Sequence, residues 1–329
     1  MRVSRAGDLV VGEWPERAEA VALLEASGAM LAWNVLTDGE LPAARVHDPD
    51  LASEWLWEIY GRATDAILGG ADEVTVPVDG DWRVRAACRV VAQLNWAEAW
   101  WPASAVAGVP ALDLGTLRAE RVINLSIVEH LLDDLDAVTG ALAALPPGVH
   151  PELAERLAVL ADNYGVVLPA GVAPSRDGYA LAAGGGVVAG GTTVFTGTSI
   201  VDWSMVPPGA VDAGAPAEWA VVRRQGVTAL EVSVPPGPRP VARLIARFGD
   251  TEVILDEVDD LGRLTGSAPV PPTVLMLPPD RRVVSVHAPG FAAPAALDPG
   301  AAARQAEIIA YALSRVGSAA ATLTERTAG

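Results

Sequence analysis

A short acidic cluster offers the residues best suited to metal binding or acid–base chemistry, namely Glu129, His130, Asp133 and Asp134. Residues four apart lie on the same side of a helix, so His130 and Asp134 could ligate one divalent ion. A pair of carboxylates with unequal burial could supply an acid and a base. The same spacing is also typical of a solvated helix face. The cluster therefore leaves a carboxylate-dependent hydrolase open without assigning any catalytic residue.

Other catalytic arrangements lack their essential residues. All 23 basic residues are arginine, so Schiff-base chemistry and the lysine-dependent phosphate sites of kinases and P-loop proteins are excluded. Cys88 lies in an apolar periodic segment, which predicts a buried side chain. The sequence contains no G-x-S-x-G motif and no zinc-ligand spacing. We expect no cofactor and no metal, and an enzyme is the less favoured interpretation.

Tryptophan points to a different kind of site. Of the ten tryptophans, eight occur by residue 101. Trp55 and Trp57 would lie about 200° apart on a helix. Trp100 and Trp101 are adjacent, so neither pair can face a single core. We expect some of these four rings to be exposed at a partner surface, where tryptophan is enriched. A core that packs against both sides of the helices is the alternative.

The charge is strongly acidic and unevenly distributed. Residues 1–165 hold 26 acidic residues and 11 arginines, whereas residues 166–329 hold 15 and 12. The net charge of −18 is the opposite of what phosphate backbones and anionic lipids attract, so we expect no nucleic-acid and no membrane partner. Acidity can serve solubility alone, and a basic partner is the alternative explanation.

Three features of the sequence predict a cytoplasmic location. No apolar run reaches the length of a membrane span, and the residues after Met1 lack the apolar stretch of a secretory signal. A single cysteine cannot form an internal disulfide and fits a reducing compartment. We therefore expect a soluble cytoplasmic protein.

Helical periodicity dominates the N-terminal half. Asp50 is the expected N-cap of a second helix that Gly69 and Gly70 stop, and Pro102 closes a third. The clearest pattern is a fourth helix, in which leucine and valine recur at three- and four-residue steps. These elements define an acidic, tryptophan-rich helical domain over 1–165, with predicted helices at 15–30, 51–68, 82–101, 116–145 and 151–163.

The pattern changes in the C-terminal half. Residues 166–216 are rich in Gly, Ala, Pro and Thr and predict a connector with short strands. Residues 217–292 alternate apolar and polar side chains in short runs between turns, which predicts an antiparallel β-sandwich. A terminal helix over 300–316, with a frayed end, is expected to dock on the N-terminal domain and completes an α+β chain. The predicted strands are 219–224, 227–234, 241–248, 252–257, 273–278 and 282–287.

Two groups of segments carry resemblances. The hairpin at 258–266 and the turn Pro289-Gly290-Phe291 resemble the prealbumin-like or carboxypeptidase-regulatory-like sandwich, although Leu264 stands where that family has an aromatic residue. The resemblance implies an Ig-like structural or interaction module without catalytic residues. Segments 100–104 and 201–209 resemble uncharacterised actinobacterial proteins of multi-gene conflict or signalling loci.

These observations favour a non-enzymatic adaptor or scaffold in a bacterial multi-protein system, either a conflict or a signalling system. The helical domain would bind a protein partner through its tryptophan-rich surface, and the sandwich would offer a second docking face. A carboxylate-dependent hydrolase and a small-ligand or glycan-binding protein are the alternatives. Glycan binding would require exposed aromatic residues on one face of a sheet.

Overall fold

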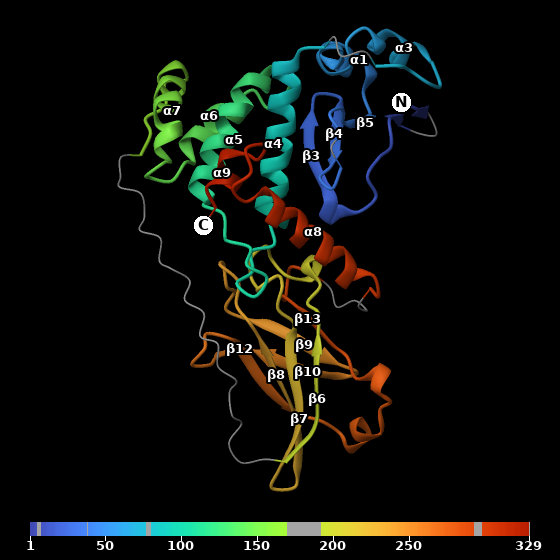
Figure 1. Ribbon diagram of the computed structural model, residues 1–329, viewed down its shortest axis with the longest axis vertical. Helices are drawn as coiled ribbons and strands as arrows, with labels where there is room; N and C mark the ends of the chain where they lie inside the picture. Colours follow the sequence, from blue (N-terminus) through green and yellow to red (C-terminus); the bar gives the residue numbers. More distant parts are fainter. Residues whose placement is uncertain (5–7, 38, 77–79, 170–191, 293–297, 329) are drawn as a thin grey trace. The chain divides into compact units, whose positions relative to one another are not determined.

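The computed structural model describes residues 1–4, 8–37, 39–76, 80–169, 192–292 and 298–328 (Figure 1). Two compact units divide the chain. The first comprises Met1–Trp100, the described part of Leu112–Arg176, and Arg315–Ala328. The second comprises Trp101–Ala111 and the described part of Asp177–Ser314. Helices and antiparallel sheets occur together, which confirms the α+β class.

The first unit begins with a five-stranded antiparallel sheet that the helical interpretation of residues 1–165 missed (Figure 1). In spatial order the strands are β1 (Val3–Ser4), β2 (Leu9–Val11), β5 (Ala43–Val46), β4 (Ala29–Asn34) and β3 (Val21–Ala26).

The helix predicted over 15–30 is wrong, because most of these residues form the β3–β4 hairpin. Ala22, Leu24 and Ala26 are buried in alternation with more exposed residues, a period of two that fits a strand. Gly28 has a φ of 74° in the turn that follows, a conformation that glycine adopts without strain. Alanine and glutamate favour a helix locally, but the burial of one sheet face outweighs that preference.

Three short helices replace the single helix predicted over 51–68, as the chain folds back at Gly61, whose φ is 56°. The N-cap of the first is Asp48 and not Asp50, because the Asp48 side chain accepts hydrogen bonds from the backbone N–H groups of Asp50 and Leu51 at 3.1 and 3.2 Å. The predicted stop at Gly69 and Gly70 is confirmed. The helices are α1 (Pro49–Ser53), α2 (Leu56–Tyr60) and α3 (Ala63–Gly69).

Two of the longer predicted helices are confirmed and one divides. α4 (Trp82–Trp100) and α7 (Pro151–Asn163) match their predictions. The predicted helix over 116–145 is wrong as a single element, because α5 (Leu114–Val128) and α6 (Ala137–Ala143) are separated by a 3₁₀ turn and an extended residue. Apolar residues on both sides of this break still share one core, but Leu135, within the break, is 83% exposed and departs from the predicted buried face.

The end of the described chain is ordered, which corrects the prediction that it frays. The predicted terminal helix is confirmed as α8 (Ala301–Arg315), and a further helix, α9 (Leu323–Arg326), follows. Thr322 and Glu325 form a capping box at the start of α9, in which each side chain bonds the other's backbone N–H. The docking of the terminal helix on the N-terminal domain is not confirmed, because α8 belongs to the second unit as far as Ser314 and only Arg315–Ala328 belong to the first.

The carboxylates of Glu120, which is partly buried, and Glu325 hold α9 in place, and we name this arrangement the C-terminal clamp. The Glu325 side chain is fully buried, and its Oε2 accepts bonds from Arg315 Nε and Nη2 at 3.1 and 2.7 Å. Gln93 Nε2 donates to Glu325 Oε1 at 2.6 Å. Glu120 accepts the backbone N–H groups of Leu323 and Thr324 at 2.8 and 2.9 Å. The clamp therefore ties α9 to α4 and α5.

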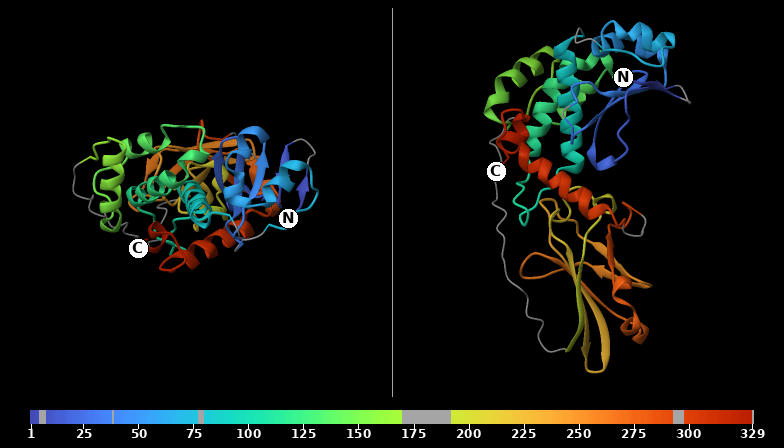
Figure 2. Two further views of the ribbon diagram at one scale, coloured as in Figure 1. Left: turned by 90° about the horizontal axis from the view of Figure 1, so that it is seen from above. Right: turned by 45° about the vertical axis from the view of Figure 1, so that its right-hand side comes forward.

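The second unit contains two antiparallel sheets that share one apolar core (Figure 2). The hairpin at 258–266 falls on two paired strands of the larger sheet. In spatial order the larger sheet is β11 (Glu257–Val258), β12 (Leu264–Pro269), β8 (Val227–Val234), β7 (Ala217–Arg224) and β6 (Thr192–Ser199), and the smaller is β10 (Thr251–Leu255), β9 (Leu244–Phe248) and β13 (Val284–His287).

Most strands predicted in this unit are confirmed, with one exception. Residues 273–278 are not a strand, because Pro271 and Pro272 start a 3₁₀ helix over Pro272–Met276. Within the predicted connector over 166–216, residues 170–191 lie outside the described residues. Among the described helices, none combines the length and apolarity needed to cross a membrane.

Candidate functional site

The acidic cluster that the sequence offered as a catalytic or metal site diverges in the structure. His130 Nε2 lies 2.9 Å from Glu58 Oε1, whereas Glu129 accepts a hydrogen bond from the Tyr164 hydroxyl. Asp133 and Asp134 are exposed. Within the described residues, no group of three or more His, Cys, Asp or Glu side chains could hold a metal ion. The break after α5 turns these side chains in different directions, so they do not form one site.

The Cys88 thiol and the Tyr164 hydroxyl both have a raised pKa. Cys88 is fully buried, and this burial, followed by the charge of Glu58, raises the pKa of the thiol to about 12. The prediction that Cys88 is a buried side chain is confirmed. The hydrogen bond to Glu129, followed by burial, raises the pKa of Tyr164 to about 12. At neutral pH both groups are therefore protonated.

The four tryptophans predicted at a partner surface have different environments. Trp55 and Trp101 are 2% and 7% exposed, and their indole N–H groups donate to Ser27 O and Pro110 O, at 2.7 and 2.8 Å. Trp100 is half-buried, whereas Trp57 is 54% exposed and its indole N–H donates to the Glu54 carbonyl oxygen, just before its helix, at 3.0 Å. Of the four, Trp57 thus presents the largest ring surface to solvent. Trp82, which the sequence argument did not select, is 71% exposed.

In the second unit a buried carboxylate fixes a loop. Asp212 is 5% exposed and accepts bonds from Ser104 Oγ at 2.6 Å and from the backbone N–H groups of Ala105 and Gly214 at 2.8 and 2.9 Å. The Ser104 hydroxyl in turn accepts from Ala107 N at 2.8 Å. These hydrogen bonds satisfy the polar side-chain atoms of both Ser104 and Asp212. The Ser104–Asp212 pair therefore holds the loop over 101–111 in place within the second unit, which is a structural role.

A groove of about 680 Å³ crosses β6, β7, β8 and β12 of the larger sheet. Hydroxyl side chains and charged pairs line it, including Arg224 with Glu231 at 2.8 Å and Arg263 with Glu218 at 3.2 Å. Trp219 also lines the groove but is only 6% exposed. The ring packs on Gly197, where a Cβ would lie 2.3 Å from it. The groove therefore offers little aromatic surface for a sugar ring, and two arginines and two glutamates of its lining are already paired with one another.

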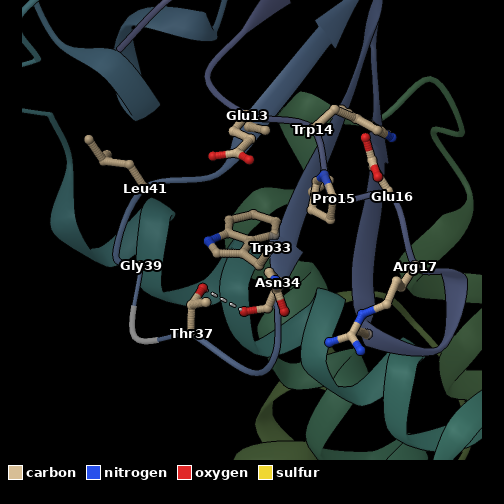
Figure 3. A pocket seen from close by; sticks show the side chains of 13 residues that line it. Glu13, Trp14, Pro15, Glu16, Arg17, Trp33, Asn34, Thr37, Gly39 and Leu41 are labelled. Carbon is tan, nitrogen blue, oxygen red and sulfur yellow. Dashed lines mark hydrogen bonds between the residues drawn. The ribbon is translucent and has the colours of Figure 1, made fainter. Parts of the chain in front are cut away.

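The first unit contains a pocket of about 500 Å³ that has a different character, and we name it the Trp33 pocket (Figure 3). The residues after β2, the end of β4 and the start of β5 surround it. Its volume falls within the range of small-ligand sites. The lining residues that matter for chemistry are Glu13, Trp14, Glu16, Arg17, Trp33, Asn34 and Thr37.

Trp33 forms the aromatic wall of this pocket. It lies on the buried face of β4, opposite Ala22 of β3, and is 5% exposed. Its Nε1 is buried and has no hydrogen-bond partner among the described residues. In Figure 3 this nitrogen points towards the side on which Gly39 and Leu41 lie. An unsatisfied buried donor costs about 1–3 kcal/mol, so this nitrogen favours any conformation or ligand that supplies an acceptor.

The polar groups around Trp33 come from two loops. Thr37 Oγ1 donates to the Asn34 carbonyl oxygen at 3.2 Å, and Leu36 N donates to Asn34 Oδ1 at 3.0 Å, which turns the chain after β4 (Figure 3). On the other side, Glu13 and Glu16 are exposed, and no ion pair or hydrogen bond to either carboxylate occurs within the described residues. The pocket thus combines an indole with two solvent-facing carboxylates.

The sequence argument missed this pocket because it assigned residues 15–30 to a helix. The signal that could have found it is the alternation of Ala22, Leu24 and Ala26, which places the next strand, and with it Trp33, in a sheet. Gly12 and Pro15 mark the loop before this hairpin as irregular.

No protein-family model matches the chain, and comparisons with curated proteins and with solved structures find no significant match. The prealbumin-like strand order and the relation to conflict or signalling loci stay predictions of the resemblances.

Proposed function

We propose that this chain is a non-enzymatic adaptor that binds a protein partner through its first unit. The observation that carries the proposal is the Trp33 pocket, where the carboxylates of Glu13 and Glu16, which pair with no described residue, line the same pocket as a tryptophan. By contrast, the carboxylate oxygens of the buried residues Glu325 and Asp212 accept hydrogen bonds from the chain itself. The Trp33 pocket therefore brings carboxylates without a described partner together with an indole N–H that lacks an acceptor.

Two further features support a binding role. Trp57 exposes more than half of its ring, and tryptophan is the residue most enriched at binding hot spots. Residues 1–165 carry a net charge of −15, which favours encounter with a basic surface. The divergence of Glu129, His130, Asp133 and Asp134 removes the arrangement on which the hydrolase alternative depended. A bacterial conflict or signalling system and a cytoplasmic location complete the proposal as predictions from the sequence.

Affinity capture from source cells, followed by reconstitution with the purified partner, tests this proposal. We expect the wild-type chain to retain a partner that binds directly, and the Trp57→Ser or combined Glu13→Gln, Glu16→Gln variants to bind it at least tenfold more weakly. Val227→Ser, which removes a 59% exposed apolar side chain from the second unit, is the matched control. Substrate turnover by the purified chain, or partner binding that none of the first-unit variants changes, would contradict the proposal.

A further inference from the structure

The two glutamates of the Trp33 pocket create a site for positive charge. Glu13 and Glu16 both line the pocket and are exposed, and neither is paired within the described residues. A cation bound in the pocket would be attracted by both carboxylates. The Arg17 side chain also lines the pocket, but it already has an interaction within the chain. Within the described residues, Glu13 and Glu16 therefore lack a cationic partner.

The indole of Trp33 adds a second and independent requirement. Trp33 lines the pocket but is only 5% exposed, so the requirement that it adds lies at its Nε1, a buried donor that needs an acceptor. A simple ammonium ion or a quaternary amine carries no acceptor. A polypeptide segment carries both groups, because a carbonyl oxygen stands next to every side chain along the backbone.

Contacts between an arginine guanidinium and an aromatic ring already occur within the chain. The guanidinium carbon of Arg45 lies 4.5 Å from the ring centroid of Trp14, which belongs to the same loop as Glu13 and Glu16. In the second unit the corresponding carbon of Arg282 lies 3.7 Å from the ring centroid of Phe195. Guanidinium groups stack on aromatic rings and bind carboxylates in a bidentate manner, whereas a lysine ammonium does neither as well.

We propose that the Trp33 pocket binds an arginine side chain of a basic segment in the partner protein, with the guanidinium between Glu13 and Glu16 and a neighbouring backbone carbonyl accepting from Trp33 Nε1. This inference rests on the proposed adaptor function, for which it names the chemistry of the partner. It also assigns a use to the acidic excess of the first unit.

Titration of the full chain with short peptides, followed through the indole N–H signals in NMR spectra, tests this inference. The probes are an acetylated and amidated Gly-Arg-Gly peptide, its lysine and glutamine counterparts, and tetramethylammonium. We expect the Trp33 signal, identified by its loss in Trp33→Phe, to shift most with the arginine peptide. Equal binding of the glutamine peptide, or no shift of that signal at millimolar arginine peptide, would overturn the inference.

Variants separate the pocket from general electrostatic attraction. The combined Glu13→Gln, Glu16→Gln variant should bind the arginine peptide at least tenfold more weakly, and Trp33→Phe, which keeps a ring but removes the N–H, about fivefold more weakly. Glu25→Gln with Glu40→Gln changes the net charge equally at exposed residues that do not line the pocket, and it should leave binding unchanged. Equal weakening by both double variants would overturn the inference.

The outcome is distinguishable from a failure of the adaptor proposal. If the double pocket variant still binds the partner as the wild type does, while Trp57→Ser does not, the arginine site is wrong and the adaptor role stands. If the arginine peptide binds as expected but no protein partner does, the pocket chemistry stands and the adaptor role is wrong.

Discussion

The first unit contains two groups of carboxylates that its fold treats in opposite ways. In the C-terminal clamp, each oxygen of Glu120 and Glu325 accepts a hydrogen bond from the chain itself. In the Trp33 pocket, Glu13 and Glu16 face solvent and pair with no described side chain. The same functional group is thus structural where the chain supplies its donors, and available for a ligand where it does not. Counting acidic residues alone does not distinguish the two.

The largest change in stability that this comparison predicts follows from breaking the C-terminal clamp. Glu325→Gln should lower the free energy of unfolding by about 3–5 kcal/mol, because Arg315 would lose the partner of a charge held in a largely buried position. Denaturant unfolding measures this change. Glu152→Gln is the control, since its contact with Arg326 is 3.7 Å long and exposed, and it should cost less than about 0.5 kcal/mol. Similar costs for both variants would remove the distinction.

A smaller effect is expected for the clamp of the second unit. Asp212→Asn should lower the free energy of unfolding by about 2 kcal/mol, because the amide N–H₂ group cannot accept from the donors that face the carboxylate. Thermal or denaturant unfolding gives the value. Asp202→Asn, at an exposed cap that also accepts from a serine, should cost about 1 kcal/mol or less. A neutral Asp212→Asn would show that the loop over 101–111 is held by other contacts.

Glu98 tests an intermediate case, a carboxylate at the surface that is fully paired. Burial raises its pKa, but the guanidinium of Arg121, at 2.5 Å, and that of Arg118, at 3.1 Å, outweigh this effect and hold the pKa below its usual value of 4.5. Because the folded pKa is the lower one, the pairing stabilises the fold above pH 4.5, and this stabilisation is lost as the pH falls through the folded pKa.

The corresponding variant gives a pH-dependent measurement. Glu98→Gln should cost less than about 1 kcal/mol at pH 7, because the pair is partly exposed and screened. The difference from the wild type should shrink as the pH is lowered, which unfolding curves from pH 7 downward would show. A difference that stays constant with pH would mean that the charge of Glu98 contributes nothing.

The smallest effect on stability is predicted for the pocket itself. The combined Glu13→Gln, Glu16→Gln variant should change the free energy of unfolding by no more than about 0.5 kcal/mol, because both side chains are exposed and unpaired among the described residues. The same denaturant curves measure it beside Glu325→Gln. A loss of several kcal/mol would place these two carboxylates with the clamp and against a binding role.

Periodicity identified elements well where one face of a regular element is buried. α7 and the strand over 227–234 have the predicted bounds, because their apolar residues recur at the period of a helix and of a strand. The β3–β4 hairpin was missed because alanine and glutamate favour a helix over a short window, whereas the sheet depends on the pairing of β4 with β5 and of β5 with β2, which lie outside such a window.

The candidate site could be predicted only in its chemistry. The acidic excess and the abundance of tryptophan before residue 102 indicated a partner surface, but Trp55 and Trp101 proved to be buried and Trp33 was not selected. Which glutamates are paired depends on distant donors, such as the Leu323 backbone N–H that bonds Glu120, 203 residues away along the chain. Local patterns carry no information about such contacts.

The assignment of Arg315–Ala328 to the first unit has a consequence for synthesis and for dissection of the chain. During translation, α4 and α5 emerge long before Glu325, so Gln93 must wait for its partner until the whole second unit has been made. A fragment that stops at residue 165 would contain α4 and α5 but not α9. The buried side chain of Gln93 would then lack Glu325, and the Glu120 carboxylate would lack the N–H groups of Leu323 and Thr324.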